Sequence, residues 1–366
     1  MADRCGRHLD MNPQPLMKPA PRPTGTSRTQ ALLELLRSRR RLLVLTHNNP
    51  DPDSLGGAVG LQEFALKAAG IPSRLAISGR IQRAENKAMV RELAIEMDRL
   101  DAIDLAQFDC VALVDTQPGF GHTFVPPNLK VDIVIDHHVC ADAVVGPADV
   151  AYFEVRNDIG ATSSIVAGHL LEAGVVPSVQ AATALAYGIR TDTADLSRDV
   201  SDLDQKAFDY LSPHVDRKRL AAITNPKLPV VYFKALKEAL SKVRMYDGVT
   251  LCSLGRTTSA EMVAEVADML LRMEGVRVVF CGGLVGASYC VSVRTELGLD
   301  AWSLLQTAFE GEKGSCGGHG SVAGGSVQLE VDARALRRLE RRLERNVLRA
   351  MGVAGGNAAM LGDLED

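Results

Sequence analysis

Short apolar runs that stop abruptly at histidine and aspartate are the feature that most constrains this chain. Residues 42–45 lead directly into Thr46-His47, and residues 131–135 lead into Asp136-His137-His138. Runs of this length are typical of buried strands. In a parallel α/β sheet, ligands gather outside the carboxyl ends of the strands, so side chains delivered there can converge. The pattern therefore predicts a parallel sheet with a functional site at one edge.

The residue types at these strand ends are those of a hard-metal site. Asp51 and Asp53 follow His47 by four and six residues, and two further apolar segments, 110–114 and 184–189, lead into aspartates. Carboxylate oxygen and imidazole nitrogen suit manganese, magnesium or iron better than a thiolate-seeking metal. This number of ligands is too large for one ion that also holds water, and it suits two ions that share a bridging carboxylate. The candidate ligands are His47, Asp51, Asp53, Asp115, His137 and Asp192.

Taken together, the motifs resemble a known family, although a single aspartate after a strand is more often a turn or helix-cap residue. HNNPDPD at 47–53, VDT at 114–116, DHH at 136–138 and TDT at 191–193 look like the four motifs of the DHH phosphoesterase superfamily. GSCGGHGSVAGG at 314–325 resembles the Gly-Gly-Gly-His signature of the DHH-associated second domain, with Cys316 in place of the first glycine. Within the superfamily the chain looks most like the bifunctional nanoRNase (oligoribonuclease) and 3'-phosphoadenosine 5'-phosphate phosphatase enzymes and the related cyclic-dinucleotide phosphodiesterases.

The resemblance implies a role for each motif residue. One divalent ion would be held by His47, Asp51 and Asp115, and a second by Asp53, Asp115, His137 and Asp192, with Asp115 bridging. Manganese is the first choice of ion, with magnesium or cobalt as alternatives. Asp136 would orient a neighbouring histidine, and His138 would contact the scissile phosphate or the leaving oxygen. The substrate-binding residues of the second domain would be Arg294, His319, Gly317 and Gly318.

Composition favours a short anionic substrate over a long nucleic-acid track. The net charge is −4 and aromatic residues make up 4% of the chain, so neither bulk electrostatics nor many stacking platforms are available. The seven cysteines are an odd number and are scattered singly, which favours a reducing cytoplasm over a disulfide framework. No apolar stretch approaches the length of a membrane span. The oligomeric state stays open, with a homodimer as one option.

The chain is expected to have an α/β fold with a parallel-sheet catalytic domain, helices on both faces of its sheet, and a smaller α/β substrate-binding domain across a cleft. Asp300 is the expected N-cap of a helix in the smaller domain, and the glycines around His319 are expected in a loop. The predicted order is an unstructured tail over 1–27, a DHH catalytic domain over 28–215, a linker and connecting helix over 216–245, a DHH-associated domain over 246–332, and a C-terminal helix and fraying tail over 333–366.

Three classes of function are consistent with these observations. The leading one is a metal-dependent phosphoesterase that hydrolyses short oligonucleotides, dinucleotides or 3'-phosphoadenosine 5'-phosphate with water activated by two metals. A RecJ-type single-strand exonuclease is disfavoured because the chain has no room for an added nucleic-acid-binding module, and a manganese pyrophosphatase lacks the Gly-Gly-His signature. A nucleotide-binding protein without catalysis is disfavoured by intact residues at all six ligand positions. The sequence leaves the exact substrate and the polarity of attack open.

Overall fold

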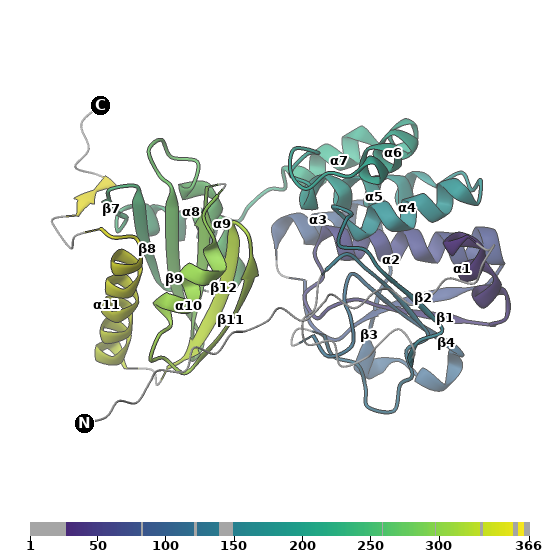
Figure 1. Ribbon diagram of the computed structural model, residues 1–366, viewed down its shortest axis with the longest axis horizontal. Coiled ribbons are helices and arrows are strands. Elements are labelled where there is room, and N and C mark those ends of the chain that lie inside the picture. Colours follow the sequence, from purple (N-terminus) through teal and green to yellow (C-terminus); the bar gives the residue numbers. More distant parts are fainter. Residues whose placement is uncertain are drawn as a thin grey trace, which may run out of the picture. The chain divides into compact units, whose positions relative to one another are not determined.

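The computed structural model describes residues 27–81, 83–120, 123–138, 149–257, 259–296, 298–329, 332–353 and 358–361 (Figure 1). These residues form two compact units. The first contains the chain up to residue 81 and residues 86–224, and the second contains residues 82–85 and the chain from 225 onward. An unstructured tail was expected over 1–27, and residues 1–26 lie outside the described residues. Among the helices that the structure describes, none has the length and apolarity that crossing a membrane requires.

The first unit is built on a parallel six-stranded sheet in the order β3-β2-β1-β4-β5-β6. Every residue of β1, β4 and β5 is buried, as expected for parallel strands covered on both faces. The strand order reverses between β1 and β4, and the crevice at such a switch point is where open α/β sheets bind ligands. The strands are β1 (Leu42–Leu45), β2 (Ser73–Ile77), β3 (Asp98–Arg99), β4 (Cys110–Val114), β5 (Ile133–Asp136) and β6 (Tyr152–Val155).

The α-helices of the first unit pack into the hydrophobic core on one face of this sheet. Helix α2 begins at Pro52, continues as a π-helical segment over Ala65–Ala69, and ends at Gly70 in the left-handed region with φ +75°. It is buried on nearly all sides because α4 and α5 pack against it. The helices are α1 (Arg28–Arg37), α2 (Pro52–Phe64), α3 (Ala84–Glu92), α4 (Thr162–Glu172), α5 (Val179–Asp192), α6 (Asp202–Leu211) and α7 (Arg217–Thr224).

The sequence predicted helices on both faces of the sheet. For the described residues of this unit that prediction is wrong, because the other face is covered differently. Leu43, Leu113 and Val134 are covered there by two short 3₁₀ helices, η2 (Leu100–Ala102) and η3 (Leu105–Gln107), and by loops. The physical reason is the composition of the connections. The segment between β4 and β5 contains three prolines, which interrupt helical hydrogen bonding.

The second unit has a seven-stranded mixed sheet in the order β11-β12-β10-β9-β8-β7-β13, in which β8 and β9 form the parallel pair. One face packs against α10 and α11 and the other against α8 and α9. Asp300 accepts a hydrogen bond from the Trp302 amide, which confirms it as the cap of α10. The elements are α8 (Val230–Leu240), β7 (Arg244–Tyr246), β8 (Val249–Arg256), α9 (Ala260–Leu270), β9 (Val278–Val285), β10 (Ser288–Thr295), α10 (Ala301–Ala308), β11 (Gly314–His319), β12 (Val322–Gln328), α11 (Ala333–Ala350) and β13 (Ala359–Met360).

Three local expectations for this unit are corrected. The connecting helix ends at Leu240, and residues 244–246 form a strand instead, because their backbone pairs with β8. The glycine-rich segment Gly314–His319 is the edge strand β11 and not a loop, since its backbone pairs with β12 along its whole length. Within the tail expected to fray, Ala359 and Met360 pair with β7.

The close packing of α2 generates a stability prediction. A methyl group added at Gly56 would lie 2.7 Å from the Ala184 carbonyl oxygen and 2.7 Å from Ser163 Oγ. We therefore expect Gly56→Ala to lower the free energy of unfolding by about 1–3 kcal/mol through overpacking, measured by urea denaturation. Gly168→Ala is the control, because its added methyl meets a movable Leu203 methyl group at 3.1 Å. Equal stability of the two variants would contradict the tight packing of α2.

Candidate metal centre

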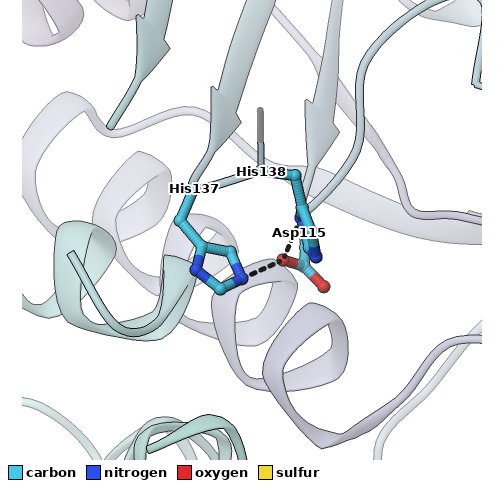
Figure 2. A group of neighbouring side chains, drawn as sticks. All are labelled: Asp115, His137 and His138. Atoms are coloured by element: carbon cyan, nitrogen blue, oxygen red, sulfur yellow. Dashed lines mark ion pairs between the residues drawn. The ribbon is translucent and has the colours of Figure 1, made fainter. Parts of the chain in front are cut away.

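Three adjacent strands deliver the core of the site. His47 follows β1 by two residues, Asp115 follows β4 directly, and His137 and His138 follow β5. Asp115 adopts a left-handed backbone with φ +60°, which is uncommon outside glycine. Its amide donates to the Ile135 carbonyl at 2.9 Å, which ties β4 to β5 just before the histidines. Figure 2 shows ion-pair lines that join the Asp115 carboxylate to both His137 and His138.

Two helices supply the remaining acidic groups. Asp51 is the N-cap of α2, and Asp53 lies fully buried in the first turn of that helix. Asp192 is the last residue of α5, so the apolar segment 184–189 that precedes it is helical and not a strand. A carboxylate at a helix C-terminus is disfavoured by the helix dipole. The position of Asp192 at the end of α5 therefore indicates that a nearby positive group compensates its carboxylate.

The six predicted ligands come together as overlapping groups. His47, Asp51 and Asp115 form one group, Asp53, His137 and Asp192 form a second, and Asp115, His137 and His138 form a third. The ligand atoms within each group lie within 4.8 Å of one another. Asp115 therefore lies between the two sets that the resemblance implies for two ions.

The separations within these groups suit ligands that share a cation better than direct hydrogen bonds. The His47 Nε2 atom lies 3.8 Å from Asp51 Oδ1 and 3.9 Å from Asp115 Oδ2. The His137 Nε2 atom lies 3.3 Å from Asp192 Oδ2, 3.7 Å from Asp115 Oδ1 and 3.9 Å from Asp53 Oδ2. Oxygen and nitrogen ligands about 2.1 Å from an ion lie roughly 3–4 Å from one another.

The orientation of His137 fits the same purpose. Its Nδ1 atom lies 3.3 Å from the Ile159 carbonyl oxygen, which fixes the proton on that nitrogen. Its Nε2 atom is buried and has no hydrogen-bond partner among the described residues. A buried polar atom without a partner is costly unless a ligand satisfies it. Nε2 faces three carboxylates, and it would bind a metal ion after giving up its proton.

The first turn of α4 holds the two buried carboxylates in place. The Thr162 and Ser163 amides donate to Asp53 Oδ2 and Oδ1 at 2.7 and 2.8 Å. The Thr162 hydroxyl donates to Asp115 Oδ1 at 2.8 Å. Sequence reasoning missed these residues. The run Thr162-Ser163-Ser164 was the available signal, because such residues are typical of a helix start that binds a carboxylate.

Asp136 is fully buried and sits behind His138. Its Oδ1 atom lies 2.8 Å from His138 Nδ1 and accepts the His137 amide at 2.8 Å. Gln117, a second residue that sequence reasoning missed, donates to Asp136 Oδ2 at 2.8 Å and to the His138 carbonyl at 2.9 Å. Asp136 and Gln117 thus fix the direction of the His138 ring.

The crowding of acidic groups changes their protonation. Burial, together with the charge of Asp192, raises the pKa of Asp53 to about 7. Burial, and then the charges of Asp53 and Asp51, raises the pKa of Asp115 well above its usual range. Burial acts to lower the pKa of His137, but the carboxylates of Asp192 and Asp53 outweigh it and raise the pKa to about 9. The residues present therefore fit divalent cations, which would replace the protons and neutralise the carboxylates.

The predicted substrate-binding residues lie in the second unit. Arg294 is in β10 and is 7% exposed, and its guanidinium pairs with Asp268 of α9 and donates to Ser292 Oγ at 2.7 Å. Gly317 and Gly318 lie in β11 and are exposed. A Cβ atom at Gly318 would lie 2.5 Å from the Val322 carbonyl oxygen, whereas one at Gly317 would meet open space. The side chain of His319 lies outside the described residues.

Comparison with known families agrees with this organisation. Residues 41–189 match the DHH family, N-terminal domain, and residues 247–345 match the DHHA1 domain. These two matches place the chain in the DHH superfamily, as a DHH domain followed by a DHHA1 domain.

Individual relatives and solved structures share most of the chain. An uncharacterized protein of Methanocaldococcus jannaschii is 35% identical over 320 residues, which cover 85% of this chain and 64% of that protein. The A-adding tRNA nucleotidyltransferase of Geobacter sulfurreducens is 23% identical over 315 residues, which cover 82% of this chain and 34% of that enzyme. The chain thus spans less than two thirds of either relative. The crystal structure of an exopolyphosphatase-related protein from Bacteroides fragilis matches this chain with a TM-score of 0.69 at 15% sequence identity. The match covers 88% of this chain and 97% of that protein's chain, which shows a shared fold.

The acidic site generates a prediction about pH and metal. The pKa of Asp53 is about 7 in the folded chain, whereas an aspartate in the unfolded chain loses its proton at about pH 4, so the folded state binds more protons between these values. The contribution of Asp53 to the stability of the metal-free protein is therefore lost as the pH rises through about 7. Manganese should stabilise the protein by about 3 kcal/mol at 100 times its dissociation constant.

Thermal unfolding with manganese or with EDTA measures this effect. We expect a larger rise in Tm from manganese at about pH 8 than at about pH 5, because the ligands must lose protons to bind the ion. Asp199→Asn, a change at an exposed aspartate that also has a positive φ, is expected to leave the shift unaltered. A shift of the same size at both pH values would contradict the assignment.

Proposed function

We propose that this protein is a metal-dependent phosphoesterase that hydrolyses short oligonucleotides, dinucleotides or 3'-phosphoadenosine 5'-phosphate. The observation that carries the proposal is the convergence of six His and Asp side chains into overlapping groups that are linked through Asp115 and His137. Bound cations would offset the charge of these buried carboxylates more fully than the neighbouring amides, imidazoles and retained protons do. Membership of the DHH superfamily supports the same chemistry.

In this proposal the metal ligands divide into two sets. One ion would be held by His47, Asp51 and Asp115, and the other by Asp53, Asp115, His137 and Asp192. When bound, two such ions lower the pKa of water and neutralise the charge that develops on phosphate oxygens. Manganese is the ion proposed first, with magnesium or cobalt as alternatives, because the oxygen and imidazole ligands suit all three.

His138 would handle the proton of the leaving group. Its Nδ1 atom is held by Asp136 at 2.8 Å, and its side chain is 36% exposed, so Nε2 is free of that contact and can reach a substrate. A carboxylate behind an imidazole stabilises the protonated ring. The ring can then donate a proton from Nε2 to the oxygen that leaves phosphorus.

The second unit would bind the substrate phosphates. The exposed backbone of Gly317 is proposed to approach a phosphate closely, since no side chain stands in front of it. Arg294 would contribute its positive charge, but it is paired with Asp268, so binding a phosphate directly requires the guanidinium to exchange that carboxylate. His319 is proposed to contact the substrate from the same strand. No long nucleic-acid track is needed for these contacts.

We propose the cytoplasm as the setting of this activity. The described cysteines at 110, 252, 281, 290 and 316 are free, as a reducing compartment would keep them. A homodimer is kept as one option for the assembly.

A substrate panel with purified protein and manganese tests the proposal. We expect release of nucleoside monophosphate from a dinucleotide, or of phosphate from 3'-phosphoadenosine 5'-phosphate, at rates well above those on long single-stranded DNA or pyrophosphate. Asp115→Asn should lower turnover by more than about 100-fold, because a shared ligand is lost while asparagine tolerates the same left-handed backbone.

The matched control is Asp199→Asn, which makes the same change at an exposed aspartate with φ +54°. It should retain wild-type turnover. Faster hydrolysis of the long strand would favour the exonuclease, and no hydrolysis of any substrate with metal bound would favour a nucleotide-binding protein.

A second variant tests the role of β11 in binding. Gly317→Ala should raise the KM for the dinucleotide several-fold while leaving Tm and metal content unchanged, because the added methyl meets no protein atom. Gly318→Ala should instead lower Tm, since its methyl group would overlap the backbone of β12. An unchanged KM in Gly317→Ala would remove this strand from the substrate site.

A further inference from the structure

The outward face of helix α11 carries a row of arginines. The helix contains seven arginines, two glutamates and no lysine over Ala333–Ala350. Four of the arginines recur at intervals of four, three and four residues, which places them on one side of an α-helix. The buried leucines and valine of α11, at 339, 343 and 347, lie on the opposite side and pack into the core of the unit. We call the outward set the arginine row: Arg334, Arg338, Arg341 and Arg345.

The row is not neutralised by its own helix. Glu340 instead accepts a hydrogen bond from Ser253 Oγ at 2.6 Å. Glu344 accepts bonds from Arg244 Nη1 at 2.6 Å and from the Tyr246 hydroxyl at 2.7 Å. Both glutamates are thus bound to the sheet, on the inner side of α11.

Two of the other three arginines of the helix form ion pairs with acidic residues outside it. Arg342 pairs with Glu312, and Arg349 pairs with Glu310. Within the part of the chain that the structure describes, none of the four side chains of the row has an ion pair. The described residues therefore present a line of exposed arginines without ion pairs, although the whole chain has a net charge of −4.

The chemistry of the row indicates phosphate as its ligand. Guanidinium groups bind phosphate oxygens through two parallel hydrogen bonds, and arginine is preferred over lysine at such surfaces. The twelve residues from Arg334 to Arg345 extend about 16 Å along the helix, enough to meet several phosphates of one strand. A membrane surface fits poorly, because a helix that lies in a bilayer inserts its apolar face, and that face of α11 is buried in the unit.

We propose that the arginine row binds the phosphate backbone of a nucleic acid strand longer than the substrate proposed above. The row shares no residue with the metal centre, so this binding does not depend on the proposed hydrolysis. It adds a sequence-independent, salt-sensitive contact to a protein whose catalytic site needs only a short substrate.

Fluorescence anisotropy with the full chain and a labelled oligouridine of about 20 nucleotides tests the proposal, with EDTA present to prevent cleavage. Wild-type protein should bind with a steep dependence on salt. Arg338→Ala/Arg341→Ala should bind more weakly, and the slope of log K against log salt should fall by about 1.4, since each lost phosphate contact on a single strand accounts for about 0.7.

The matched control is Arg342→Ala/Arg349→Ala, which removes the same charge from the same helix at arginines that are already paired. It should change the slope by clearly less. Arg338→Lys/Arg341→Lys, which keeps the charge, should retain most of the slope. Arg334→Gln/Arg345→Gln provides a second test at the other two positions of the row, and thermal unfolding checks that each variant is folded.

Several results would overturn the proposal. These are no binding of the RNA by the wild-type protein, equal losses in the row and control variants, or a dependence on the row for phosphatidylserine vesicles or polyglutamate but not for RNA. Hydrolysis of a dinucleotide should be the same in the row variants as in the wild type. Failure of hydrolysis in the wild type would sink the proposed function while leaving the RNA result to stand by itself.

Discussion

The mutual repulsion of buried carboxylates is the constraint on which the first unit depends. Asp53 and Asp115 are almost completely buried. Burial raises the pKa of Asp115, and the negative charges of neighbouring carboxylates raise it further; these are Asp53, Asp51, Asp136 and Asp192. Three kinds of compensation are built around them: amides at the start of α4, imidazoles after β1 and β5, and retained protons where neither suffices. Divalent cations would complete this compensation.

Tight packing beneath the site makes this crowding possible. Gly56 lets α2 approach α5 so closely that no methyl group would fit between them, and Gly188 of α5 leaves the same kind of space beside Asp53. Gly57 of α2 likewise lies against Val114, the last residue of β4, because an added Cβ atom there would be 2.8 Å from Val114 Cγ1. The strained backbone of Asp115 is held by its bond to Ile135 and by the Thr162 hydroxyl. Stability and site geometry are therefore properties of the same contacts.

Much of this arrangement was predictable because strand ends carry chemical information. The apolar runs before His47, Asp115 and Asp136 are all buried strands, and their parallel pairing brings those ends to one edge of the sheet. Asp192 lies beside Asp53 and His137, but its position at the end of a helix was not predicted. A short apolar run does not distinguish a strand from a buried helix by period alone. Thr162, Ser163 and Gln117 were missed because they act through partners more than fifteen residues away in the sequence.

The sequence by itself determined which residue types stand at the ends of the apolar segments, and hence the superfamily, the parallel sheet and the acidic, imidazole-rich character of the site. Only the tertiary structure decided which carboxylates share a neighbour, which amides satisfy them, and that β11 is a strand with open space before Gly317. It also decided that Arg294 is paired with Asp268, whereas no acidic side chain that the structure describes forms an ion pair with the arginine row of α11. The reason is physical: identity and spacing are local properties, whereas charge compensation depends on which distant groups the packed chain brings within a few ångströms.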